Sequence, residues 1–309
     1  MENIFGSVHY NAIGPYLKKQ FGGRVAKLSL DGGFTCPNRD GSKGTGGCAF
    51  CGGDGSGRFA GPLVQQKRQL ASKWPEDTRY IAYFQNFTGT YAPVEKLRQL
   101  WDEALALPGC AGLAVATRPD CLPDDVLDLL EEFDQKTFLW VELGLQTACE
   151  ETAAAFNRCY KNADFEESMG KLSARGIKAV IHLILGLPGE DKRQILSSAE
   201  YAASFRPFGM KLHMLHLMEG TAMGEQYKNA PFPLLTREEY VGLVCDIIER
   251  LPQDITVHRV TGDAPREDLI APLWTGHKKA VLRAVQQEFK ARGTFQGYFS
   301  KSGPRSPAI

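Results

Sequence analysis

Several common signals are missing from this sequence. Its start, MENIFGSVHYNAIGPYLKKQF, has neither the basic flank and apolar run nor the small-residue cleavage site of a secretory signal peptide. No stretch reaches the roughly 18 uninterrupted apolar residues that a membrane-spanning helix requires. Basic and acidic side chains number 36 each, so the total charge indicates neither a nucleic-acid-binding coat nor an acidic tail. We therefore expect a cytoplasmic protein that does not enter the membrane.

Paired cysteine motifs are scarce too. The chain has eight cysteines but a single Cys-x-x-Cys pair, and no pair of histidines at zinc-ligand spacing. In a chain of this length without an export signal, cysteines are more often metal ligands or buried apolar residues than disulfides. Internal repeats and low-complexity linkers are missing as well. We predict one domain over residues 1–309, with a core at about 22–260 and a C-terminal extension at 261–309.

Charge is uneven along the chain despite the balanced total. The segment from His277 to Ile309 carries +6 and the rest −6, and aromatic residues (Phe289, Phe295, Tyr298 and Phe299) lie among its basic ones. Such a segment can bind a polyanion through phosphate contacts and base stacking. A solvated helix face followed by a frayed terminus would have the same composition. The basic residues are Lys278, Lys279, Arg283, Lys290, Arg292, Lys301 and Arg305.

Short β-rich runs alternate with amphipathic helical patterns along the chain. Strict alternation predicts right-handed crossovers and a parallel sheet, which closes partly if the strands follow in sequential order. We therefore predict an α/β fold with a partial (β/α)6-type parallel barrel, and a doubly wound open sheet is the alternative. The predicted strands cover about 24–30, 79–84, 113–116, 138–143, 178–185, 210–215 and 255–260, and the helices about 94–107, 124–133, 165–174, 194–205, 237–251 and 279–289. Pro93, Pro123 and Thr236 lie where three of these helices should begin.

Three cysteines share one loop after the first predicted strand. Cys36 is followed by eleven residues, then Cys48, two further residues and Cys51. Three converging thiolates can hold zinc with a fourth ligand from elsewhere, or a 4Fe-4S cluster with one iron left open. A structural zinc site is normally closed by four protein ligands, so the missing fourth cysteine favours an open coordination position.

Glycines surround these cysteines. They would let backbone amides approach a cluster and stabilise its reduced, more negative state, although a merely flexible loop would have the same composition. Of the other cysteines, Cys245 lies in an apolar helical stripe, and the remaining four match no familiar ligand spacing. The loop glycines are Gly46, Gly47, Gly52, Gly53, Gly55 and Gly57.

The cysteine loop resembles the signature of the radical S-adenosylmethionine (SAM) superfamily in its long-spaced form. The resemblance is to the elongator-catalytic-subunit-like proteins and most closely to the YtqA/YhcC group, and Phe50 is the aromatic residue typical before the last cysteine. It implies a 4Fe-4S cluster on Cys36, Cys48 and Cys51, with SAM on the open iron. The matching segments are LDGGFTCPNRDG, YIAYFQNFTGTYAPVE, ATRPDCLPDD, LWVELGLQT, HLILGLPGE, KLHMLHLMEGT and VHRVTGD.

The resemblance also implies which residues bind SAM, all near the ends of predicted strands. Polar groups after the second strand match those that bind the SAM amino group, and two at the end of the fourth can reach the sulfonium side or the ribose. A segment on the fifth strand matches the one that packs along adenine. Each polar position would equally suit a turn or a helix cap. These residues are Gln85, Asn86 and Thr88, then Glu142 and Gln146, then Ile184, Gly186 and Gly189.

Polar residues after the last two predicted strands are expected on the substrate side. His213 and His216 follow the sixth strand, and His258, Arg259 and Asp263 follow the seventh. We predict catalytic or substrate contacts for His213, His258, Arg259 and Asp263. A lone histidine on a strand is, however, more often structural.

The resemblance further implies a reaction and its partners. A one-electron donor such as flavodoxin or ferredoxin would drive reductive cleavage of SAM to methionine and a 5'-deoxyadenosyl radical. The YtqA branch implies an MnmL-type reaction on tRNA, converting a 5-carboxymethylaminomethyl wobble uridine to 5-aminomethyl-2-thiouridine, and the YhcC branch shares the motifs. Two alternatives are a radical SAM enzyme acting on a protein side chain or metabolite, and a noncatalytic iron-sulfur or zinc-binding module.

Overall fold

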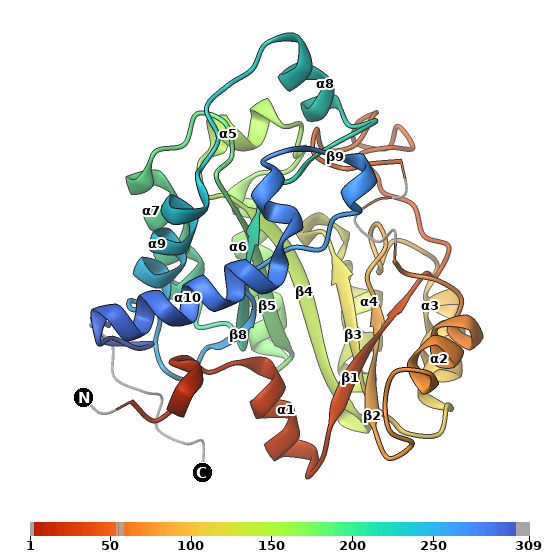
Figure 1. Cartoon of the computed structure of the whole chain (residues 1–309). Helices are drawn as coiled ribbons and strands as arrows, with labels where there is room; N and C mark the ends of the chain where they lie inside the picture. The colour runs from red at the N-terminus through yellow and green to blue at the C-terminus, as the bar shows by residue number, and fades with distance from the viewer. Residues whose placement is uncertain (1–2, 54, 56–58, 301–309) are drawn as a thin grey trace. The chain divides into compact units, whose positions relative to one another are not determined.

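The computed structural model describes residues 3–53, 55 and 59–300. Seven of its strands form one sheet in the order β1-β2-β3-β4-β5-β6-β8, and the strand pairs along it run parallel where their register is defined. The predicted α/β class with sequential parallel strands is confirmed (Figure 1). The strands are β1 (Val25–Leu30), β2 (Arg79–Phe84), β3 (Cys110–Thr117), β4 (Phe138–Gln146), β5 (Lys178–Leu185), β6 (Gly209–Met214) and β8 (Thr256–Arg259).

Contacts between Cα atoms divide the chain into two compact units. The first comprises Met1–Tyr16, Leu145–Phe156 and Ile181–Ile309, and the second comprises Leu17–Gly144 and Asn157–Val180. The single domain expected over residues 1–309 stays a prediction. No helix in the described part of the chain is long and apolar enough to cross a bilayer.

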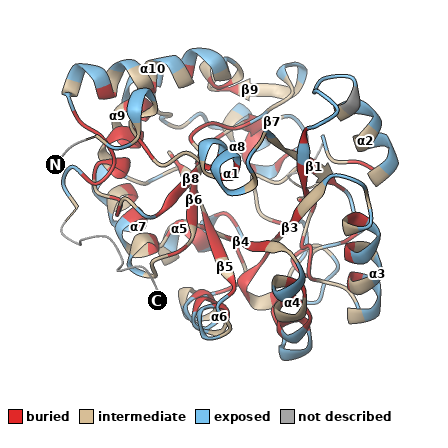
Figure 2. Cartoon of the chain, turned by 90° about the horizontal axis from the view of Figure 1, so that it is seen from below, coloured by how far each residue is buried: buried red, intermediate tan, exposed pale blue. Residues whose placement is uncertain are grey.

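The second unit contains β1 to β3 and most of β4. The strands β2 and β3 are almost continuously apolar and buried, as expected for parallel strands covered on both faces. Between α3 and α4, Trp101 meets Phe133 edge to face at 5.3 Å, and both are fully buried. Figure 2 shows these two helices with one buried and one exposed face. The helices are α2 (Leu63–Ala71), α3 (Val94–Leu105), α4 (Asp124–Lys136) and α6 (Asn162–Ala174).

The first unit contains β6, β8 and the helices near the C-terminus. The predicted helix start at Thr236 is confirmed, since its hydroxyl caps α9 and Glu239 completes a capping box. The helix α10 packs beside α9 and buries Val281, Val285 and Phe289 (Figure 1). The helices are α5 (Glu150–Ala155), α7 (Lys192–Ser204), α8 (Ala222–Asn229), α9 (Arg237–Ile248) and α10 (Lys278–Arg292), with a small antiparallel sheet of β7 (Leu217–Met218) and β9 (Leu269–Ala271).

The segment after α10 is anchored by Gln296, which is fully buried. Its backbone N–H donates to the carbonyl of His9 at 2.9 Å, and its side-chain oxygen accepts from the N–H of Asn11 at 2.8 Å. Its amide nitrogen donates to the carbonyls of Pro252 at 2.6 Å and Ile255 at 2.8 Å. Every polar group of the side chain therefore has a hydrogen-bond partner. Through these bonds Gln296 joins both ends of the described chain to the turn between α9 and β8.

Two of the four aromatic residues that could have stacked on bases are buried, which excludes that role for them. Phe289 is fully buried beside His9, and Phe295 is also in the core, whereas Tyr298 and Phe299 are exposed. The helical period places Phe289 on the same buried face of α10 as Val285, and the aromatic composition of the segment does not show which face is buried. Lys301, Arg305 and Gly57 lie outside the described residues.

Candidate functional site

The cysteine loop connects β1 to α2 and is held by local turns. The N–H of Arg39 donates to the carbonyl of Cys36 at 2.8 Å, and that of Cys51 donates to the carbonyl of Cys48 at 2.8 Å. All three cysteines are free and half-buried. Phe50 lies within the second turn, where it was expected beside Cys51. The chain thus presents the three sulfurs from two tight turns of one loop.

Electrostatics link the three thiols. Desolvation, assisted by the neighbouring thiolates of Cys51 and Cys36, raises the pKa of Cys48 to about 12. Desolvation likewise raises the pKa of Cys51 to about 11, with Cys36 adding and Arg39 opposing. Three sulfurs that repel one another as thiolates are the donor set that a metal group stabilises, because the metal charge offsets the repulsion. Cys36, Cys48 and Cys51 therefore fit a thiolate-ligated group.

The loop is not arranged around a single metal ion. Within residues 3–53, 55 and 59–300, no three Cys, His, Asp or Glu side chains form a group that could hold one ion. In a 4Fe-4S cluster each thiolate binds a different iron, so the ligands stand farther apart than those of one ion. The donor set thus suits a cluster by its chemistry.

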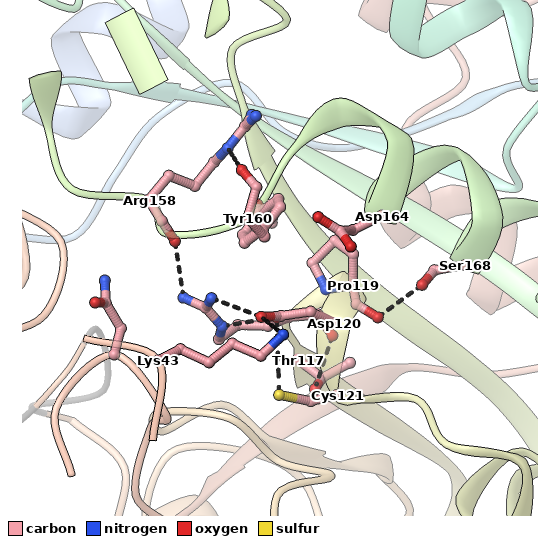
Figure 3. Close-up of polar contacts among 12 residues, drawn as sticks. Lys43, Thr117, Pro119, Asp120, Cys121, Arg158, Tyr160, Asp164 and Ser168 are labelled. Atoms are coloured by element: carbon pink, nitrogen blue, oxygen red, sulfur yellow. Dashed lines mark hydrogen bonds and ion pairs between the residues drawn. The ribbon is translucent and has the colours of Figure 1, made fainter. Parts of the chain in front are cut away.

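A buried ionic network centred on Asp120 reaches the cysteine loop at Lys43 (Figure 3). The guanidinium of Arg118, directly after β3, makes two hydrogen bonds of 2.9 Å to the carboxylate of Asp120 and a third of 3.1 Å to the carbonyl of Arg158. Lys43, on the cysteine loop, pairs with Asp120 at 3.0 Å. The charge of Arg118 lowers the pKa of Cys48 and so favours its thiolate. Arg118 was not among the predicted site residues, because its only signal in the sequence is a basic residue after a buried strand.

Two of the residues expected to bind SAM keep unpaired polar atoms. Asn86 is nearly buried and Thr88 fully buried, and neither the Asn86 Oδ1 nor the Thr88 hydroxyl has a hydrogen-bond partner. A buried polar atom without a partner costs about 1–3 kcal/mol, so such atoms are expected where a polar ligand binds. Gln85, by contrast, accepts a hydrogen bond from Ser29 at 3.2 Å. These residues lie at the end of β2, where they fit a polar ligand group.

Glu142 is held firmly in place on β4. Its fully buried carboxylate accepts hydrogen bonds from the hydroxyl of Tyr83 at 2.5 Å and the indole of Trp140 at 2.9 Å. Lys27 lies 3.7 Å away and also stands over both aromatic rings. Glu142 therefore has a structural role in addition to any contact with a ligand.

In the first unit, Gln146 and Gly186 both have left-handed backbone conformations. Gln146 has a φ of 63°, which a residue other than glycine seldom adopts without a local reason. Gly186 has a φ of 89°, and a Cβ there would lie 2.8 Å from the side chain of Leu235. A small apolar pocket lies beside Gly186, and Ile184 precedes its first lining residue in the chain. The pocket is lined by Leu185, Gly186, Met214, Leu215, Leu234, Leu235, Tyr240, Pro272 and Trp274.

Two histidines of the first unit are neutral at physiological pH. His213 stacks on His182 with ring centroids 5.6 Å apart, and burial lowers its pKa well below the usual value, assisted by Arg259. Burial also lowers the pKa of His216 to about 4, while its Nδ1 lies 2.9 Å from the hydroxyl of Thr275. Both rings can donate and accept hydrogen bonds but carry no charge.

Arg259 and Asp263 form an ion pair at 2.7 Å, and Lys278 bonds the other oxygen of Asp263 at 2.7 Å. Although burial alone would raise it, Arg259 and Lys278 keep the pKa of Asp263 below its usual value. His258 points elsewhere, with its Nε2 3.0 Å from the hydroxyl of Thr256 at the start of β8. Arg259 therefore interacts electrostatically with His213 and forms an ion pair with Asp263. His258 instead contacts Thr256.

Comparison with known proteins gives the class of the enzyme. Residues 40–202 match the radical SAM superfamily, and residues 207–291 match the Radical_SAM C-terminal domain. The chain belongs to the radical SAM superfamily, whose enzymes bind a 4Fe-4S cluster and SAM. A noncatalytic metal-binding module is thereby excluded.

Two relatives of similar length specify the group. The chain is 46% identical over 298 residues to the uncharacterized protein YtqA of Bacillus subtilis, and the aligned region covers 94% of this chain and 92% of that protein. It is 39% identical over 272 residues to protein YhcC of Escherichia coli, which covers 85% of this chain and 87% of that protein. The expected similarity to the YtqA/YhcC group is confirmed.

Two further similarities are partial. The tRNA uridine(34) acetyltransferase of Dehalococcoides mccartyi is 26% identical over 186 residues, which are 59% of this chain and 39% of that protein. The solved structure of the archaeal Methanocaldococcus infernus Elp3 superposes with a TM-score of 0.66 at 17% identity, over 88% of this chain and 64% of that chain. At this identity the Elp3 similarity concerns the fold.

Proposed function

We propose that this radical SAM enzyme acts on the wobble uridine of tRNA and converts its 5-carboxymethylaminomethyl group to the 5-aminomethyl group of 5-aminomethyl-2-thiouridine. The observation that carries the enzyme chemistry is the loop of three mutually coupled thiols. The tRNA assignment is supported by one partial relative named as a tRNA uridine(34) acetyltransferase. A protein side chain or a metabolite is the alternative substrate.

In this proposal Cys36, Cys48 and Cys51 hold the cluster, with Phe50 beside the last thiolate. The bound cluster and SAM supply a 5'-deoxyadenosyl radical once an external donor such as flavodoxin or ferredoxin provides one electron. Asn86 and Thr88, whose buried polar atoms have no partner, are proposed to bind polar groups of SAM, and Gln85, Glu142 and Gln146 are further candidates. Ile184, Gly186 and Gly189 are proposed to lie along the adenine ring, as the resemblance implies.

The residues proposed for the substrate differ in charge. Neutral His213 can hydrogen-bond a base edge, whereas Arg259 can bind an anionic group because Asp263 is shared with Lys278. We keep His258 as a weaker candidate, since its ring is engaged near Thr256.

Nucleoside mass spectrometry of tRNA tests the reaction. Cells without this protein should accumulate the 5-carboxymethylaminomethyl wobble nucleoside and lose the 5-aminomethyl product. The wild-type gene should restore the product, whereas the Cys48→Ala variant should not, because the proposed cluster would be missing. Wobble nucleosides that are unchanged by deletion would contradict the tRNA assignment and favour the alternative substrates.

The exposed face of α10 is proposed to bind tRNA phosphates. Lys279, Arg283 and Lys290 are exposed and make no ion pair among the described residues, and the helical period puts them on one face. Lys278, also expected there, is instead neutralised by Asp263, and Arg292 is paired with Asp246 and Glu288. The phosphate-binding surface is therefore smaller than the +6 segment of the sequence indicates.

Changing Lys279, Arg283 and Lys290 together to glutamine should weaken tRNA binding at low salt. The slope of log affinity against log salt should fall in magnitude by about 2 to 3, since each phosphate contact contributes about 0.7 to 0.9. Filter binding at several salt concentrations measures this. The same change at Lys136, Lys171 and Arg175, which are ion-paired in the second unit, is the charge-matched control. An equal loss in both triple variants would refute a specific role for α10.

A further inference from the structure

We propose that Asn38 and Asn157 form an amide clamp that fixes the cysteine loop and places an N–H donor on the sulfur of Cys48. The proposal rests on the proposed cluster site at Cys36, Cys48 and Cys51. Neither asparagine belongs to the expected ligands of the cluster or of SAM. Both lie in the second unit, where a direct hydrogen bond joins them although they are far apart in sequence.

Asn38 is the inner half of the clamp. It stands two residues after Cys36 and is 0% exposed. Its amide nitrogen lies 3.7 Å from the Sγ of Cys48 and 2.5 Å from the carbonyl oxygen of Asn157, so each acceptor can take one of its two N–H groups. A Cβ at Gly44 would lie 2.3 Å from the Asn38 Oδ1, so glycine there leaves room for the amide. The burial and the close packing fix the direction in which Asn38 donates.

Asn157 is the outer half of the clamp. Its side-chain amide donates to the carbonyls of Gly47 at 2.9 Å and Thr45 at 3.2 Å, while its own carbonyl accepts from Asn38. It has a φ of 62°, a left-handed conformation that asparagine tolerates better than most residues. The N–H of Gly47 also donates to the carbonyl of Asn38 at 2.8 Å. Asn38 therefore donates to Asn157, and both asparagines are hydrogen-bonded to the loop around Gly47.

The clamp is attached to the ionic network of Figure 3. Arg158, the residue after Asn157, is 1% exposed, and its carbonyl accepts from Arg118 at 3.1 Å. Arg118 is paired with Asp120, which also holds the cysteine loop at Lys43. The loop is thus gripped at two points, by Asn157 on one side and Asp120 on the other.

A donor on a ligating sulfur has a defined consequence. Hydrogen bonds to cluster sulfurs stabilise the reduced, more negative state and raise the reduction potential. The N–H of Asn38 would therefore make it easier for an external donor to deliver the electron. The contact of Asn157 with the loop backbone would slow loss of the cluster without altering the potential.

Redox titration of the reconstituted protein without oxygen, followed by electron paramagnetic resonance, tests the donor. Asn38→Leu removes the N–H at similar volume and should shift the one-electron equilibrium about tenfold toward the oxidised cluster, which is about 59 mV. Asn229→Leu, the same change at an exposed residue on α8, should leave the potential unchanged. Asn38→Ser keeps an O–H donor and should recover part of the shift. A wild-type potential in Asn38→Leu at full iron content overturns the donor role.

The rate of iron release to a chelator tests the clamp. Asn157→Gly keeps the left-handed backbone and the acceptor for Asn38 but removes the bonds to Thr45 and Gly47. It should release iron at least severalfold faster at an unchanged potential, and release at the wild-type rate overturns the clamp. Iron uptake by Asn38→Ser but not by Asn38→Leu would support the role of a hydrogen-bond donor at this position. Loss of iron from both variants would overturn the proposal that Asn38 tunes the reduction potential. Failure of the cluster site itself would appear differently, as full iron content in the cysteine variants.

Discussion

Replacing Cys36, Cys48 or Cys51 with alanine should abolish the iron-sulfur cluster, whereas the wild-type protein, reconstituted without oxygen, should hold about four iron and four sulfide. Each thiol should be indispensable because the loop supplies only the three thiolates that the proposed cluster needs. Iron and sulfide analysis, with visible absorption, measures the effect. Release of 5'-deoxyadenosine from SAM with dithionite should disappear in the same variants.

Cys149→Ala is the matched control for these variants. Cys149 is also free and half-buried, but it lies in the first unit next to Glu151 and Gln194. It should keep the full cluster and the wild-type rate of SAM cleavage. Full iron content in any of the three loop variants, or tightly bound zinc without iron, would overturn the proposed ligand set.

Asp120→Ala should destabilise the protein strongly. The change leaves the guanidinium of Arg118 buried without its partner and frees Lys43, and breaking a buried pair in this way costs about 3–5 kcal/mol. Urea unfolding of wild type and variant measures the difference. Asp128→Ala removes an exposed partner of Arg175 and should change the free energy of unfolding only slightly.

The same carboxylate gives stability a pH dependence. Burial alone would raise the pKa of Asp120, but its hydrogen bonds and ion pairs with Arg118 and Lys43 keep the pKa below its usual value. A folded pKa below the unfolded one means that the stabilisation is complete above about pH 4 and is lost as the pH falls through the folded pKa. Acidification in this range should therefore narrow the stability gap between wild type and Asp120→Ala. A gap that stays constant down to pH 2 would contradict this account.

The fold was largely predictable because its signals are local. All seven strands of the parallel sheet were predicted from apolar runs, and Pro93, Pro123 and Thr236 marked the starts of α3, α4 and α9. The helices α1 (Ile13–Phe21), α2, α5 and α8 were missed. All four have nine residues or fewer, which is less than the window of about 11–18 residues over which a helical period can be recognised in a sequence.

The site was predictable only where its residues are close in sequence. The spacing of Cys36, Cys48 and Cys51 indicated a metal-ligand loop, and the resemblance to the radical SAM signature implied a cluster. The partners that hold this loop, Asp120 and Asn157, are remote in the chain and have no local signature. In the same way, the charge of Lys278 is cancelled by Asp263 across a tertiary contact, and the position of Phe289 in the core depends on helix packing.

The bonds of Gln296 decide where the chain can be shortened. The sequence similarity to the Radical_SAM C-terminal domain ends at residue 291, inside α10 and before this residue. A chain ended there would leave the N–H of Asn11 and the carbonyls of Pro252 and Ile255 without the partner that now satisfies them. A shortened form of this enzyme should therefore keep the side-chain amide of Gln296, which lies several residues beyond the end of the matched family region. Its C-terminus should fall no earlier than about residue 300, so that the backbone around Gln296 is kept.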